Sequence, residues 1–161
     1  MRRLHISVTI DNNLKNIGIK RGWLKTLTSN VFKYIKIQHP VEMGVRLTDN
    51  SCIRELNRRY RGRNTATDVL SFNMVDPAGE GEFIDAPDRI KHIGEIVISW
   101  DKSAEQAKLF GIGIKKEIAI LTIHGILHLL GYDHENENDH IIMHTEETHI
   151  LENVELEMDL D

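Results

Sequence analysis

Residues 124–134 have the sequence HGILHLLGYDH, and the rest of the chain is organised around this stretch. His124 and His128 are four residues apart, so on a helix their side chains lie on one face about one turn apart. The flanking residues 118–123 and 129–130 are mostly apolar, which predicts a buried helix rather than a surface helix. Gly131 is expected to end this helix in the left-handed conformation, so that the chain turns and offers His134 to the same site.

Three histidines at this spacing match a catalytic zinc site, which has three protein ligands and an open fourth position. We therefore predict that His124, His128 and His134 bind one Zn²⁺. The same residues fit the metzincin peptidase pattern H-E-x-x-H-x-x-G-x-x-H at every position except one. Gly125 stands where a peptidase has the glutamate that acts as general base, and we expect its missing side chain to leave room for a bulkier substrate.

Length and composition indicate one domain at residues 1–154, followed by an acidic, frayed tail at 155–161. The single cysteine, Cys52, permits no internal disulfide and fits a cytoplasmic protein. No signal peptide or membrane span is expected, because no apolar run is long enough. The net charge of −5 means that a polyanion must be bound by a local basic patch.

Alternating apolar residues predict four strands, at 4–10, 41–47, 67–74 and 93–100. Apolar periodicity and capping residues predict five helices. They are expected at about 20–37, at 101–110 capped by Asp101 or Ser103, at 118–130, and at 140–154. A further short helix is expected after the capping cluster at 48–51 (TDNS), with Ile53, Leu56 and Tyr60 facing inward.

Residues 76–92 contain glycines, prolines and acids, which predict an exposed, mobile loop between two antiparallel strands. The expected fold is α+β: a single small domain with a four-stranded, mostly parallel or mixed sheet packed with about five helices.

A basic cluster lies between residues 54 and 63, where five of the ten residues are arginine. Arginine suits phosphate because its planar guanidinium can donate to two oxygens. We predict contacts to nucleic acid from Arg58, Arg59, Arg61 and Arg63. The alternative is a solvated helix face whose arginines pair with acids such as Glu55.

Four stretches together resemble the YbeY family of single-strand-specific endoribonucleases: LNRRYRG at 56–62, TDVLSF at 67–72, IGEIVIS at 93–99 and the histidine motif. The resemblance implies a zinc ion on the three histidines and an essential arginine, here Arg61. It also implies processing of the 3′ end of 16S rRNA, action on defective ribosomes, and contact with the small ribosomal subunit in the bacterial cytoplasm. Ala66 departs from the family's usual proline, and the 76–92 loop looks long for the family.

The expected chemistry is cleavage of a phosphodiester. Zinc can activate water or polarise a phosphoryl oxygen, and Arg61 can stabilise charge in the transition state. A carboxylate is expected to orient water or a ligand imidazole, with Asp68, Glu95 and Asp133 as candidates. Two alternatives are a metallopeptidase and a non-catalytic ribosome assembly factor in which zinc is structural.

Overall fold

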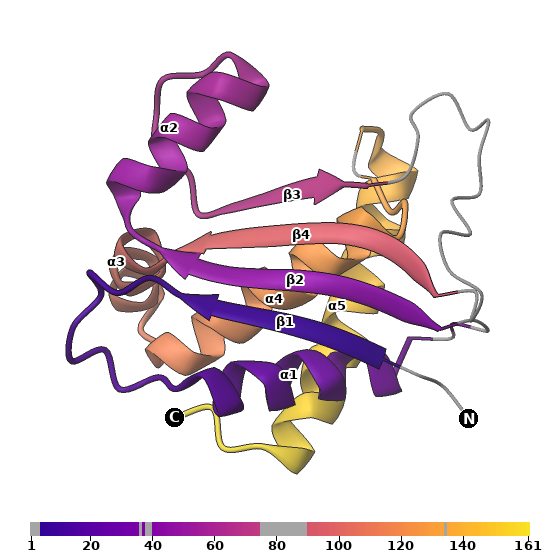
Figure 1. Cartoon of the computed structure of the whole chain (residues 1–161). Coiled ribbons are helices and arrows are strands. Elements are labelled where there is room, and N and C mark those ends of the chain that lie inside the picture. The colour runs from indigo at the N-terminus through magenta and orange to yellow at the C-terminus, as the bar shows by residue number, and fades with distance from the viewer. Residues whose placement is uncertain (1–3, 36, 38–39, 75–89, 134) are drawn as a thin grey trace.

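The computed structural model describes residues 4–35, 37, 40–74, 90–133 and 135–161. Within this part of the chain, four strands form one sheet in the order β1-β2-β4-β3 (Figure 1). β1 pairs with β2 and β2 with β4 in parallel, whereas β3 runs antiparallel to β4. The strands are β1 (Leu4–Ile10), β2 (Val41–Thr48), β3 (Val69–Asn73) and β4 (Lys91–Ser99). The prediction of a four-stranded mixed sheet is confirmed.

Five helices accompany the sheet in the described residues, as predicted for an α+β domain. α1 and α4 pack on one face of the sheet, and α5 packs against both of them (Figure 1). α2 lies over one end of the opposite face, where it contacts β4. The helices are α1 (Arg21–Lys33), α2 (Asn50–Arg61), α3 (Trp100–Phe110), α4 (Ile114–Leu129) and α5 (Glu137–Glu157).

The main core lies between the sheet and the layer of α1, α4 and α5. α4 sits between the sheet and α5, which explains why its sequence is apolar around most of its circumference. Ile118, Ile123, Ile126 and Leu127 are all almost completely buried. The histidine motif therefore lies on a buried helix, as its flanking residues predicted.

The N-termini of α2, α3 and α5 are capped by side chains that accept from free backbone N–H groups. Asp49 caps α2 by accepting from Cys52 N at 2.8 Å, within the predicted capping cluster. The prediction for α3 is wrong, because its cap is Ser99, whose Oγ accepts from Lys102 N at 3.1 Å. β4 continues directly into α3, so the last strand residue takes the capping position, and Asp101 instead accepts from Asn50 N.

Three further boundaries differ from the predictions. α1 ends at Lys33 rather than near 37, in a tight turn where Tyr34 N donates to Val31 O. Residues 155–161, predicted as a frayed tail, continue α5 to Glu157 and bury Leu160 in the main core. Most of the loop predicted at 76–92 lies outside the described residues, and Lys91 and His92 belong to β4.

None of the helices in the described ranges combines the length and apolar composition needed to cross a bilayer.

Candidate active site

The two described histidines of the motif face each other on α4. His124 and His128 are half-buried, and their Nε2 atoms are 3.0 Å apart. Two nitrogens bound at 2.0–2.1 Å to one tetrahedral zinc ion lie about 3.3 Å apart. The observed separation is close to that value, so both side chains fit one zinc ion after a small adjustment.

A carboxylate from α5 contacts the other side of His124. Glu147 Oε1 lies 3.3 Å from His124 Nδ1. A proton on Nδ1 would donate to this carboxylate and leave the Nε2 lone pair directed toward His128, which is the form a metal needs. Glu147 could not be predicted from the sequence, because its contact with His124 depends on how α5 packs against α4 and not on any local spacing.

The turn after α4 is formed as predicted. Gly131 has φ +96°, and Tyr132 N donates to Leu127 O at 3.0 Å across the end of the helix. His134, the third predicted ligand, lies outside the described residues. Within the described ranges, no group of three His, Cys, Asp or Glu side chains is arranged to hold a metal ion. The described part of the predicted zinc site is therefore its two helical ligands.

A cavity of about 740 Å³ joins the histidines to the loop between α2 and β3. Its walls come from the end of α2, the segment leading into β3, β3 itself and the histidine face of α4. The lining residues are Asn57, Arg61, Arg63, Thr65, Ala66, Thr67, Asp68, Val69, Leu70, Ser71, Asn73, His124 and His128. The histidine motif and the basic cluster, which lie far apart in the sequence, thus meet in one cavity.

The arginine cluster divides into two groups. Arg61 and Arg63 line the cavity, and Arg61 Nη2 donates to the main-chain oxygen of Ser71 at 2.6 Å. Arg58 and Arg59 instead lie beside Glu55, at 2.6 Å and 3.7 Å, and neither lines the cavity. Arg58 and Arg59 therefore fit the alternative interpretation, in which the arginines lie on a solvated helix face and pair with acids.

The three candidate carboxylates lie in different places. Asp68 lines the cavity, and its Oδ1 accepts from Val69 N at 2.7 Å. Glu95 is exposed on the sheet face opposite α4, since the side chain of the next residue, Ile96, faces α4. Asp133 is exposed after the α4 turn and lines a smaller pocket with Tyr132. Of the three, Asp68 is the one that shares the cavity with the histidines.

Gly125 faces the sheet and not the cavity. A Cβ at this position would lie 2.8 Å from Ile96 Cγ2 on β4 and 3.4 Å from Ser71 Oγ. Such a short carbon–carbon separation is repulsive, so only glycine lets α4 approach β4 this closely. The expectation that the missing side chain leaves room for substrate is wrong, because the space is occupied by Ile96.

Glu117 is a buried acid on α4, on the same helix face as His124 and His128. It is only 2% exposed, and its Oε1 accepts from Gln106 Nε2 at 3.3 Å. Its Oε2 is buried and has no hydrogen-bond partner among the described residues. Burial raises the pKa of Glu117, and the negative charge of Asp68 raises it further.

We expect Glu117→Gln to stabilise the protein at neutral pH and to have little effect in acid. The raised pKa means that the folded state binds a proton more tightly than the unfolded state, so wild-type stability falls as pH rises above about 4.5. The neutral amide avoids burying a charge, and the free energy of unfolding should rise by about 1 kcal/mol at pH 8. Urea unfolding between pH 4 and pH 8 measures the effect.

Glu152→Gln, at an exposed position of α5, is the matched control and should change stability equally little at both pH values. If Glu117→Gln changed the free energy of unfolding equally at pH 4 and pH 8, ionisation of the buried Glu117 carboxyl would not be what destabilises the wild-type protein.

Comparison with known proteins identifies the family to which this chain belongs. Residues 9–155 match the family model described as Endoribonuclease YbeY. Proteins named Endoribonuclease YbeY from Syntrophomonas wolfei and Caldicellulosiruptor bescii are 42% identical over 127 residues and 38% identical over 158 residues. The first match covers 79% of this chain and 81% of the relative, and the second covers 94% and 99%.

A solution structure from Thermotoga maritima has a similar fold, with a TM-score of 0.59 and 29% sequence identity. The similarity covers 92% of this chain and 88% of that chain. The similarity therefore extends over most of both chains.

Proposed function

This chain belongs to the YbeY family of endoribonucleases, and from that premise we propose that it is a zinc-dependent enzyme that cleaves single-stranded RNA. The observation that carries the proposal is the single cavity shared by His124, His128, Arg61 and Arg63. We further propose that its substrate is the 3′ end of 16S rRNA, that it removes defective ribosomes, and that it contacts the small ribosomal subunit in the cytoplasm.

His124 and His128 would hold the zinc ion together with His134, the predicted third ligand outside the described residues. Bound zinc would supply a Lewis acid beside the phosphate. Glu147 would keep the His124 ring oriented through the contact to Nδ1. The imidazole pair is already converged on α4, so little side-chain reorganisation is needed for binding.

Arg61 is suited to bind the scissile phosphate. A guanidinium has five N–H donors, and the bond to Ser71 O uses one of them while fixing the side chain against β3. Arg63 adds a second positive charge in the same cavity. Charge that develops on the phosphate in the transition state would be stabilised by these fixed cations. Asp68 lies in the same cavity and is our candidate for accepting a proton.

We expect Arg61→Ala to lower kcat/KM for single-stranded RNA by about 100-fold while leaving the zinc content unchanged. Arg61→Lys should recover only part of this loss, because an ammonium cannot donate to two phosphate oxygens as a planar fork. Arg59→Ala is the matched control, since Arg59 lies beside Glu55 and does not line the cavity. Equal rates for Arg61→Ala and wild type would remove Arg61 from the site and direct attention to Arg63.

The function is tested by incubating the zinc-loaded protein with labelled rRNA and, separately, with casein, each with and without a chelator. The proposal predicts chelator-sensitive cleavage of RNA, its restoration by zinc, and intact casein. Chelator-sensitive cleavage of casein with intact RNA would favour the metallopeptidase. Binding of rRNA without cleavage of either substrate would favour the non-catalytic assembly factor.

A further inference from the structure

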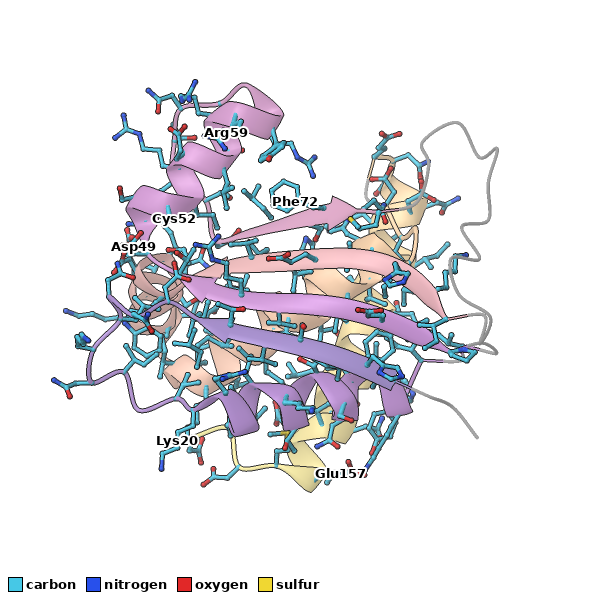
Figure 2. The ribbon with its side chains drawn as sticks, in the orientation of Figure 1. Lys20, Asp49, Cys52, Arg59, Phe72 and Glu157 are labelled. Atoms are coloured by element: carbon cyan, nitrogen blue, oxygen red, sulfur yellow. The ribbon has the colours of Figure 1, made fainter. Side chains whose placement is uncertain are left out.

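Two aromatic side chains meet beside the cavity, at the junction of α2 and β3. The ring centroids of Tyr60 and Phe72 are 5.4 Å apart, with an angle of 67° between the ring planes. Tyr60 was expected to face inward, but 60% of its surface is exposed. Figure 2 shows the Phe72 ring standing off β3 toward α2. Phe72 is half-buried and packs against the small cluster of Ile53, Leu70 and Val97, so the aromatic surface that the pair presents to solvent comes mainly from Tyr60.

Arg61 connects this aromatic pair to the cavity. Its guanidinium carbon lies 6.0 Å from the centroid of the Phe72 ring, and its Nη2 donates to the main-chain oxygen of Ser71. Arg61 also lines the cavity that contains His124 and His128. One guanidinium thus borders both the aromatic pair and the proposed phosphate site.

The arrangement also follows from the geometry of β3. Successive side chains of a strand point to opposite faces, so Phe72 points toward α2, whereas Ser71 donates through Oγ to Gly125 O on α4. β3 is an edge strand of the sheet in the described part of the chain. A polymer whose phosphate is held in the cavity could pass this strand and place an adjacent group against the aromatic pair.

We propose that Tyr60 and Phe72 form a stacking site for one unpaired nucleobase, next to the phosphate held by Arg61. The proposal rests on the proposed function, because it assumes that the cavity binds an RNA phosphate. Stacking on aromatic side chains tolerates any base sequence, since every base has a π face. A base inside a duplex has both faces covered by its neighbours, so the site selects single-stranded RNA without reading its sequence.

Tyr60→Ala should raise KM for single-stranded RNA by about 10-fold, within the range of roughly 5- to 150-fold that loss of one base stack produces, and should change kcat little. Tyr60→Phe should behave like wild type, because it keeps the ring and loses only the hydroxyl. Tyr60→Leu should behave like Tyr60→Ala, because it keeps apolar area without a π face. Tyr60 is exposed, so these substitutions leave the core intact.

Phe110→Ala is the matched control. Phe110 is 62% exposed on α3 and is not among the described residues that line the cavity. KM for single-stranded RNA should be the same in this variant as in wild type. An equal rise in KM for Phe110→Ala and Tyr60→Ala would overturn the stacking site.

The decisive experiment combines Tyr60→Ala with RNA that carries a single abasic nucleotide, moved in turn through the positions around the mapped cleavage site. Zinc-loaded wild type should show raised KM when the abasic nucleotide lies at one position adjacent to the cleaved phosphate. At that position the abasic RNA and Tyr60→Ala should not have additive effects, because each removes the same stack. Additive penalties at every position would overturn the inference.

The two proposals fail in different ways in this experiment. If wild type does not cleave the unmodified RNA, the proposed function fails and the stacking site fails with it. If wild type cleaves RNA and Tyr60→Ala has unchanged KM, the proposed function stands and only the stacking site is refuted.

Discussion

His128→Ala protein should contain almost no zinc after dialysis and should cleave RNA at least about 1000-fold more slowly than wild type. The substitution removes one of two imidazoles whose Nε2 atoms converge at 3.0 Å on α4. The variant keeps no more than two of the three predicted ligands. Catalytic zinc sites use three protein ligands, so we expect the variant to bind zinc weakly. A Lewis acid contributes several kcal/mol to catalysis, and each 1.36 kcal/mol is a factor of ten in rate.

Folding and metal binding must be separated in this test. Elemental analysis gives the zinc content, and the melting temperature with and without added zinc gives a second measure, since a ligand that binds the folded state raises it. Wild type should show a zinc-dependent rise that His128→Ala lacks. His144→Ala, at an exposed position of α5, should behave like wild type. Stoichiometric zinc in His128→Ala would refute the metal site.

Much of the fold could be predicted because its signals are local. Alternation in Val41, Met43, Val45 and Leu47 marked a strand with one buried face, and this face packs in the main core. The apolar composition of α4 marked a helix covered on both sides. Boundaries were less predictable where a cap came from a neighbouring element, as with Ser99, which is both the last residue of β4 and the cap of α3.

The candidate site was predictable only in part, because several of its contacts join distant segments. The His124–His128 pair follows from helical spacing, whereas Glu147 reaches His124 from α5 through packing between helices. Sequence spacing also could not show which arginines line the cavity and which pair with Glu55. Glu55 lies one turn before Arg58 and Arg59, while the left-handed turn at Gly62, with φ +70°, redirects the chain toward Arg63 and the cavity.

The position of Glu95 on β4 also could not be predicted from the local sequence pattern. Both faces of β4 carry apolar residues, so alternation does not decide which face lies toward α4. In the structure Ile96 faces α4, and Glu95 is therefore on the opposite face from the histidines. The fold, and not the local pattern, leaves Asp68 as the candidate carboxylate inside the cavity.

Gly125→Glu should prevent stable folding instead of converting the site into a peptidase. From the sequence, a glutamate at this position restores the peptidase pattern with an intact zinc site. In the structure, however, even a Cβ would lie 2.8 Å from Ile96 Cγ2, and Gly125 is buried between α4 and β4. A carboxylate would have to be buried in this interface without a charged partner, so we expect a loss of more than about 3 kcal/mol in the free energy of unfolding.

The cause can be isolated with smaller substitutions. Gly125→Ala should lower the free energy of unfolding by about 1–3 kcal/mol, because overpacking forces α4 away from β4. Ile96→Ala removes the Cγ2 atom that a Cβ would meet, so the double variant should be more stable than the sum of the single effects predicts, by about 1 kcal/mol. Urea unfolding of the four proteins measures this coupling. If the effects of the two substitutions on the free energy of unfolding were strictly additive, contact with Ile96 would not be the reason that position 125 requires glycine. A folded, zinc-bound Gly125→Glu protein that cleaves peptides would show that the peptidase arrangement fits this helix.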